Sequence, residues 1–325
     1  MEQFGEHATK TQYSLLNNLD YHKLQESCIK RGINTNGITK KYDLIILFIQ
    51  WYNNIKYLSN NLIHGYVVCE KGSRKHMEDN FIIHVQGNTS IYGVFDGHGG
   101  NYISTRLKEY CIKYLMTKLI GSKLNKDNIY KSFLDIDGKF FDIWKKNLFG
   151  TDGSTSSFVI QRKNILYFVN LGDSRTVLYC DNGTYFSTKD HKPSDASEYE
   201  RIENTKYTVI MKDVARIGGF LAVSRSFGDY VYKIDEEDNY RPIDYAVSVM
   251  PDIYKIDINS IISRQKLIIS ATDGLWDVFS NSQVFQYIRN GRNRGLGYKS
   301  ILKNLVNLAY ERGSTDNITI VMVEL

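Results

Sequence analysis

The sequence predicts an α+β fold, in which antiparallel sheet packs on itself and helices lie outside it. Short segments with strand-like alternation come first, two longer segments with helical spacing follow, and strand-like segments then resume. The turn Asp181-Asn182-Gly183 marks a hairpin, which joins antiparallel strands. The 325 residues are 42% hydrophobic and 24% charged, as in a folded protein, and the net charge of +5 does not imply a nucleic-acid or membrane partner.

The first part of the chain has a helical pattern. Residues 13–30 and 42–52 are expected to form two helices, joined by a Gly- and Asn-containing turn at 32–37. The pattern changes near residues 59–65, where strand-like alternation begins. We therefore expect a helical N-terminal extension, residues 1–62, and a second domain, residues 63–325.

The second domain is expected to open with strands at 66–69, 80–85 and 90–95. Helices follow at 102–119 and 128–144, because apolar residues such as Ile103 and Leu107 recur there at helical spacing. Further strands are expected at 154–160, 165–171, 176–179, 246–249, 266–270 and 318–323, and late helices at 282–290 and 298–312.

The cysteines and the apolar runs indicate a reducing, intracellular setting. Four cysteines are scattered and never occur as C-x-x-C, so neither a disulfide frame nor a zinc site is indicated. The longest apolar run, 44–49, is far shorter than the ~20 residues that cross a bilayer. No basic segment followed by an apolar core opens the chain. We expect a cytoplasmic or nuclear protein without a membrane partner.

Acidic residues stand at the ends of the expected strands, next to turns. They are Asp96, Asp173, Asp273 and Asp316, with the pair Glu78-Asp79 before the strand at 80–85. One such residue alone is often an ordinary turn residue. Carboxylates gathered at one rim would repel each other, and metal cations usually relieve that repulsion. Oxygen ligands without clustered Cys or His indicate Mg²⁺ or Mn²⁺.

Eight segments resemble, in order, the motifs of the metal-dependent type-2C protein serine/threonine phosphatases. They are 72–79 (GSRKHMED), 94–100 (VFDGHGG), 153–155 (GST), 169–175 (VNLGDSR), 190–193 (DHKP), 221–229 (LAVSRSFGD), 271–277 (ATDGLWD) and 313–319 (GSTDNIT). The resemblance implies a β-sandwich of two antiparallel sheets flanked by pairs of α-helices (α-β-β-α), with a dinuclear metal centre at one end. It covers the chain from about residue 65 onward.

The resemblance also implies roles for single residues. Asp96 would bridge two Mg²⁺ or Mn²⁺ ions, and the Gly97 carbonyl would bind one of them. Asp273 and Asp316 would bind the other ion, and Glu78 and Asp79 would ligate or hold metal-bound waters. Asp173 and Asp277 match positions that take a third, weaker ion in some members.

The implied reaction is hydrolysis of phosphoserine or phosphothreonine in proteins. A metal-bridging hydroxide would attack phosphorus directly, without a phospho-enzyme intermediate. Arg74 would clamp the phosphate oxygens, and His98 would protonate the leaving oxygen. The alternatives are a surface cation for Arg74 and a structural residue beside the metals for His98.

The sequence bears on four other functions. Cysteine phosphatases place five residues between Cys and Arg, but four separate Cys69 from Arg74. A nucleotide P-loop at 32–39 is excluded because Ile38 stands where Lys must neutralise phosphate. A catalytically silent scaffold usually loses metal-ligand carboxylates, which are present here. A phosphatase of small phosphoesters would share the same metal chemistry.

The N-terminal extension has a second resemblance. Residues 24–33, Gly37 and 41–45 resemble the helix–loop–helix of SAP-type nucleic-acid-binding modules, with a loop two residues longer than usual. We favour instead a helical pair that packs on the catalytic core or makes a dimer contact, because helical apolar spacing more often means packing. Nucleic acid would be contacted only through this extension, and the oligomeric state stays open.

Overall fold

The structure is a computed structural model that describes residues 20–29, 35, 41, 64–117, 124–146, 150–181 and 183–325. The chain divides into two compact units, Met1–His64 and Gly65–Leu325. In the smaller unit, helix α2 (Tyr21–Ile29) begins where the Asp20 carboxylate accepts a hydrogen bond of 2.8 Å from the amide of Lys23. The rest of the expected helix 13–30, the helix 42–52 and most of the SAP-like segment lie outside the described residues.

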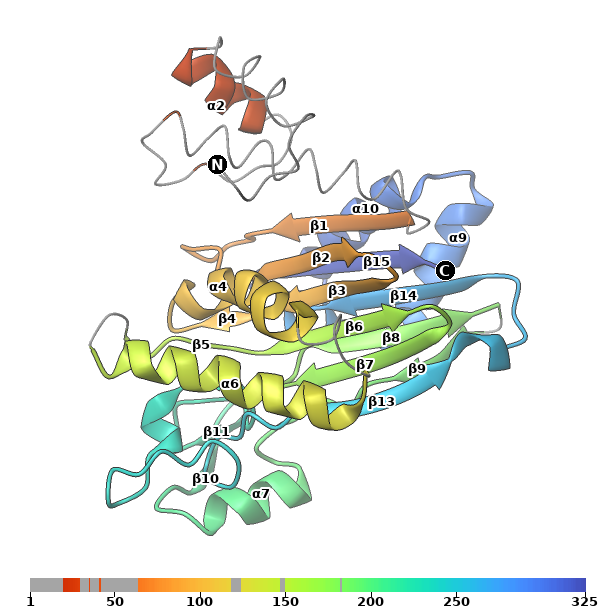
Figure 1. The fold of residues 1–325 in the computed structure, drawn as a ribbon. Coiled ribbons are helices and arrows are strands. Elements are labelled where there is room, and N and C mark those ends of the chain that lie inside the picture. Colours follow the sequence, from red (N-terminus) through yellow and green to blue (C-terminus); the bar gives the residue numbers. More distant parts are fainter. Residues whose placement is uncertain are drawn as a thin grey trace. The chain divides into compact units, whose positions relative to one another are not determined.

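The larger unit is built on two five-stranded sheets (Figure 1), with the orders β1-β15-β14-β8-β9 and β13-β7-β6-β3-β2. Every pair in the second sheet is antiparallel, as are β15–β14, β14–β8 and β8–β9 in the first. The strands of the first sheet are β1 (His64–Glu70), β8 (Arg175–Cys180), β9 (Gly183–Ser187), β14 (Lys266–Ala271) and β15 (Ile318–Glu324). Those of the second sheet are β2 (Asn80–Gln86), β3 (Thr89–Phe95), β6 (Ser156–Arg162), β7 (Ile165–Leu171) and β13 (Asp252–Asp257).

Short strands and helices complete the unit. The short strands are β4 (Gly97–His98), β5 (Gly153–Ser154), β10 (Val209–Met211), β11 (Ala215–Ile217) and β12 (Phe227–Gly228). The helices are α4 (Tyr102–Tyr110), α6 (Lys126–Trp144), α7 (Ala196–Glu203), α8 (Asp273–Trp276), α9 (Asn281–Asn293) and α10 (Tyr298–Glu311). A π-helical segment, η1 (Cys111–Met116), continues α4, and two 3₁₀ turns are η2 (Tyr230–Lys233) and η3 (Ile258–Ser260). In the described part of the chain, no helix combines the length and apolar character needed to span a membrane.

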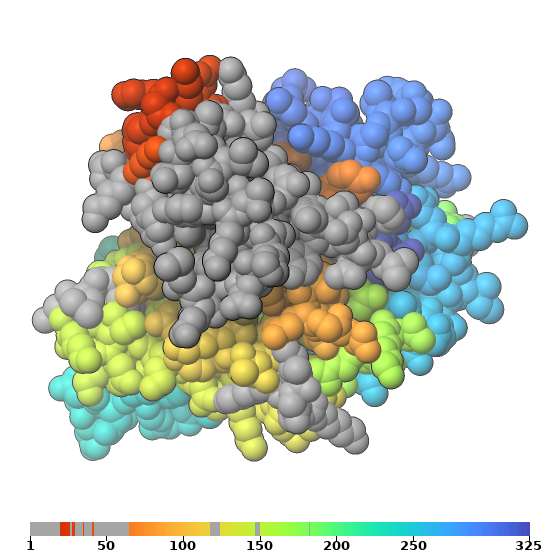
Figure 2. All heavy atoms as spheres, turned by 45° about the horizontal axis from the view of Figure 1, so that its top comes forward, coloured from red at the N-terminus to blue at the C-terminus, as the bar shows by residue number. Residues whose placement is uncertain are grey.

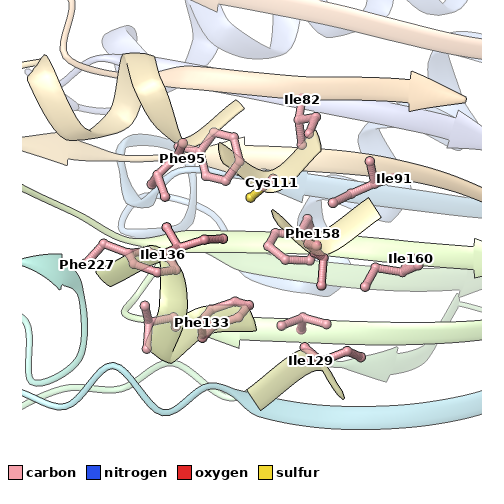
Figure 3. Packing of buried hydrophobic residues seen from close by; sticks show 14 of the residues in the cluster. Ile82, Ile91, Phe95, Cys111, Ile129, Phe133, Ile136, Phe158, Ile160 and Phe227 are labelled. Atoms are coloured by element: carbon pink, nitrogen blue, oxygen red, sulfur yellow. The ribbon is translucent and has the colours of Figure 1, made fainter. Parts of the chain in front are cut away.

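Helices cover both outer faces of the sandwich, which gives the expected α-β-β-α arrangement (Figure 1). On one side, Phe133 and Ile136 of α6 and Cys111 of η1 pack with Phe95 and Phe158 of the second sheet (Figure 3). On the other, α9 and α10 cover the first sheet, where alternate residues of β14 (Leu267, Ile269 and Ala271) join their core. Alternation sends Ile268 and Ser270 to the opposite face, toward the other sheet.

The layer between the sheets becomes polar near one end. The Ser157 hydroxyl of β6 pairs with that of Thr176 in β8 at 2.7 Å, and the Thr176 hydroxyl donates to Ser270 at 2.8 Å. These buried hydroxyls satisfy one another across the two sheets.

A smaller layer, which we call the side layer, is formed by residues 196–247 at one side of the unit. Its own core contains Ile202 of α7, Ile217 of β11 and the adjacent residues Tyr245, Ala246 and Val247. In Figures 1 and 2 this teal segment lies on the opposite side of the unit from the blue helices α9 and α10. We call the hairpin 209–221 within it the flap.

One expected strand is wrong. Residues 246–249 are buried, but the chain bends at Ala246 and Val247. Their amides donate to separate carbonyls: that of Val247 to Tyr232, that of Ser248 to Ser224 and that of Val249 to Pro242. The apolar pattern reflected burial, and within the described residues the segment forms one isolated bridge, Ser248 with Arg225, rather than a ladder. The strand lies just after it, because β13 pairs with β7 over Asp252–Asp257.

Candidate metal and phosphate site

One cleft of about 1250 Å³ in the larger unit is lined by every predicted site residue except Asp79, which is buried behind it. The lining residues among them are Arg74, Glu78, Asp96, Gly97, His98, Asp173, Asp273, Asp277 and Asp316. Residues far apart in the sequence therefore share one cavity.

Antiparallel register brings the acidic residues to the same rim. Asn80 pairs with Phe95, so Glu78 and Asp79 before β2 lie beside Asp96 after β3. Ala271 pairs with both Arg175 and Ile320, so Asp273 after β14 lies close to the start of β8 and of β15. Asp173 precedes β8 and Asp316 precedes β15, which places both at this rim.

Two glycines allow the close packing of this rim. A Cβ on Gly97 would lie 2.3 Å from the Glu78 carbonyl oxygen and 2.7 Å from the Ser104 hydroxyl, which itself donates to that carbonyl. Gly172, with φ +96°, lets the chain turn between β7 and Asp173. A side chain at position 97 would push Glu78 away from Asp96.

The carboxylates raise each other's pKa. Burial, together with the charges of Asp273 and Asp316, raises the pKa of Asp79 to about 8, although the Thr272 hydroxyl donates to Asp79 at 2.9 Å. Burial and then the charge of Asp273 raise the pKa values of Asp96 and Asp173 well above their usual range. Burial, with the charges of Asp277 and Asp316, raises the pKa of Asp273 to about 6. The site thus holds more negative charge than the protein compensates.

Two protein cations reach the cluster. Arg74 Nη2 lies 2.7 Å from Asp316 Oδ2, and the guanidinium is more than half exposed at the mouth of the cleft. Lys192 Nζ lies 3.6 Å from Asp277 Oδ1, and its charge also faces Asp173. The two ion pairs are made with Asp316 and Asp277, whereas the Asp79 carboxylate accepts from the uncharged Thr272 hydroxyl.

The donor set fits hard divalent cations. Half-buried carboxylates in mutual repulsion, with the Gly97 carbonyl beside them, are the oxygen ligands that Mg²⁺ and Mn²⁺ prefer. Among the described residues, no three His, Cys, Asp or Glu side chains already form a ligand group. The oxygens have other partners: Asp316 Oδ2 accepts from Arg74, and Asp316 Oδ1 accepts from the Asn317 amide at 2.7 Å.

His98 has a partner that sequence reasoning missed. Its Nε2 lies 2.7 Å from Asp229 Oδ2, which also accepts from the Ser226 hydroxyl at 2.5 Å. Burial lowers the pKa of His98, but the charge and hydrogen bond of Asp229 outweigh burial and raise it. Asp229 belongs to the motif 221–229, yet nothing in its spacing indicates that it meets His98.

A buried ion pair holds the segment that carries Asp229. Lys233 Nζ donates to Asp137 Oδ2 of α6 and to the Ser226 carbonyl, each at 2.8 Å, and both charged side chains are fully buried. Asp137 also accepts from the Gly228 amide at 2.9 Å and from the Tyr240 hydroxyl at 2.5 Å. This network ties residues 226–240 to α6.

Asn317 plays a similar part for Arg74. Its side-chain amide donates to the Lys71 carbonyl at 2.8 Å and to the His76 carbonyl at 3.1 Å, and its oxygen accepts from the Glu78 amide at 2.8 Å. The loop that carries Arg74 is thereby fixed to the start of β15.

Comparisons with known proteins agree on one family. Residues 63–318 match the family model described as "Protein phosphatase 2C". Protein phosphatase 1B of Homo sapiens is 35% identical over 285 residues, which are 81% of this chain and 57% of that protein. A probable protein phosphatase 2C 7 of Oryza sativa subsp. japonica is 33% identical over 258 residues, which are 78% of this chain and 63% of that protein. The chain thus spans less than two thirds of the length of these relatives.

Solved structures share the fold. A phosphatase from Toxoplasma gondii superposes with a TM-score of 0.68 at 23% identity, covering 80% of this chain and 91% of that one. A C. elegans sex determining protein gives a TM-score of 0.68 at 22% identity, covering 98% of this chain and 83% of that one. At these identities the likeness establishes the fold.

Proposed function

Because the chain belongs to the protein phosphatase 2C family, we propose that it is a Mg²⁺- or Mn²⁺-dependent protein serine/threonine phosphatase. The observation that carries this proposal is the convergence of carboxylates from both sheets in one cleft, with a guanidinium at its mouth. Excess buried negative charge is the arrangement that divalent cations stabilise, and the cations in turn attract a phosphate dianion.

We assign the metal-binding residues as the sequence predicts them. Asp96, Gly97, Asp273 and Asp316 would hold two ions, with Glu78 and Asp79 ligating or holding their waters. Bound ions would supply a nucleophilic water at neutral pH and stabilise charge on the phosphate. Asp173 and Asp277 would take a third, weaker ion, for which Lys192 would compete because it already pairs with Asp277.

Arg74 would bind the phosphate. Its guanidinium now pairs with Asp316, but it is exposed and its loop is held by Asn317, so it can turn toward phosphate oxygens without moving the backbone. A planar guanidinium binds two such oxygens at once.

His98 would give a proton to the leaving serine or threonine oxygen. Asp229 holds the ring by Nε2 and stabilises the protonated form that this role needs. Direct attack of water, without a phospho-enzyme, would then release phosphate.

The proposed substrates are intracellular phosphoproteins. Cys69, Cys111 and Cys180 are free thiols, which suits a reducing compartment. A cytoplasmic or nuclear location is part of this proposal.

Phosphate release from a phosphothreonine peptide tests the function. We expect release with Mn²⁺ or Mg²⁺ and none after EDTA treatment. Asp96→Asn removes one carboxylate from the centre of the cluster, and we expect it to abolish release at every metal concentration. Calorimetric titration with Mn²⁺ gives a second readout, since the variant should also bind the ion more weakly.

The outcomes separate the alternatives. No release from folded wild-type protein at saturating metal would refute the enzyme and favour a binding scaffold. Release of phosphate from small phosphoesters but from no phosphopeptide would support the metal-dependent hydrolysis and refute the proposal that the substrates are proteins.

A further inference from the structure

The flap presents apolar side chains to the same cleft that holds the carboxylates. Phe220 is 77% exposed and Met211 is 69% exposed, and both line the cleft. Val214 of the flap and Val231 of η2 are also exposed and line the cleft. We call these four residues the apolar flap surface. Single exposed apolar side chains are ordinary, but several beside one cavity indicate a binding surface.

The fold keeps this surface exposed. Val209 pairs with Ile217 across the hairpin, and both face the small core of the side layer, with Ile217 fully buried. Met211, at the end of β10, and Val214, in the turn, are exposed by contrast. The hairpin is thus anchored by one face while its tip remains available.

Polar contacts hold the flap in this shape. Arg216 pairs with Asp213 at 3.1 Å and donates to the Phe220 carbonyl at 3.0 Å. Lys212 Nζ donates to the Gly219 carbonyl at 2.6 Å and lies 5.4 Å from the centre of the Phe220 ring. The two cations of the hairpin are engaged within it. Arg216 and Asp213 also line the cleft, but their charges oppose each other in the ion pair. The apolar side chains are thus presented on a preorganised hairpin, which lowers the entropy lost on binding.

The rest of the cleft indicates what binds there. Arg74, Lys75 and His76 line the same cleft as the carboxylates, and a phosphate dianion complements the cations among them. The volume of about 1250 Å³ exceeds the roughly 300–1000 Å³ that a small ligand fills. A phosphorylated side chain at the carboxylates would therefore leave room for its neighbours in the chain against the flap.

We propose that the apolar flap surface binds an apolar side chain close in sequence to the phosphorylated residue of a protein substrate. This inference rests on the proposed function and adds a preference to it: substrates with Leu, Met or Phe beside the phosphothreonine are hydrolysed faster than those with Ser there. The flap discriminates between substrates through desolvation of that side chain.

The test uses two peptides with the same phosphothreonine, flanked by Leu in one and by Ser in the other. We expect the full chain to give a kcat/KM roughly tenfold higher for the Leu-flanked peptide, mainly through KM, since burial of one apolar side chain gives such a factor. In Phe220→Ser/Met211→Ser this ratio should fall to about one. Ile262→Ser changes a fully exposed apolar residue outside the cleft and should keep the wild-type ratio.

p-Nitrophenyl phosphate has no flanking residues, so it distinguishes a failure of the flap inference from a failure of the proposed function. If wild type hydrolyses it and both peptides, but with equal kcat/KM for the peptides, the flap inference is overturned and the proposed function stands. If no substrate is hydrolysed with metal present, the proposed function fails. If the peptides are equal and wild type is a dimer that Phe220→Ser converts to a monomer, the surface binds a second copy, and the inference is likewise overturned.

Discussion

The buried Asp137–Lys233 pair offers a stability test of how the site is held. Lys233→Met removes the ammonium but keeps a side chain of similar length, so little cavity is left. Removing one partner of a buried pair costs about 3–5 kcal/mol, because the other charge stays buried. Asp137 would retain the Gly228 amide and the Tyr240 hydroxyl as donors. We therefore expect Lys233→Met to lower the free energy of unfolding by about 3 kcal/mol, the lower end of that range.

The exposed pair Lys189–Asp195 supplies the matched control. Its charged atoms lie 3.2 Å apart, and the lysine side chain is 61% exposed. Lys189→Met should cost about 0–1 kcal/mol, because solvent already screens that pair. Thermal unfolding followed by tryptophan fluorescence should show Tm lowered by roughly 6–12 °C in Lys233→Met and by less than about 4 °C in Lys189→Met.

A double variant makes the test sharper. Asp137→Asn with Lys233→Met removes both charges, so the two losses should not add. If Lys233→Met is no less stable than the Lys189→Met control, the pair does not hold the 226–240 segment and this reasoning is refuted.

Two further predictions concern His98 and the side layer. Asp229→Asn should lower kcat on a phosphothreonine peptide by roughly 10- to 100-fold and affect p-nitrophenyl phosphate much less, because that leaving group needs no proton from His98; equal losses on both substrates would contradict the role. Glu198 is buried, and hydrogen bonding and charge from Arg225 and Arg201 outweigh burial and bring its pKa to about 2. A lowered folded-state pKa stabilises the protein above the ordinary value of about 4.5, and this stability is lost as pH falls toward 2. Urea unfolding from pH 6 to pH 3 should therefore show a shallower loss of stability in Glu198→Gln than in wild type, and parallel curves would argue against this pairing.

Much of the fold was predictable because it depends on local pattern. Strands such as Thr89–Phe95 and Ile318–Glu324 and helices such as Asn281–Asn293 lie where periodicity indicates them. The one wrong strand, 246–249, shows the limit of that signal. Apolar residues report burial, whereas a strand also needs a neighbour with which to form a ladder. In the described residues, this segment forms a single isolated bridge, between Ser248 and Arg225.

The sequence by itself determined the chemistry of the site. It shows which carboxylates lie at the ends of apolar strands, and it places Arg74 and His98 in the same motifs as some of these carboxylates. Tertiary structure decided what holds and completes it. Thr272 reaches Asp79 across 193 residues, Asp229 reaches His98 across 131, and Lys233 reaches Asp137 across 96. Such pairs leave no spacing signal, because each depends on how two sheets and α6 pack rather than on the local chain. The apolar flap surface is of the same kind, since exposure is a property of what packs nearby, and only the folded chain shows that Phe220 and Met211 are largely exposed.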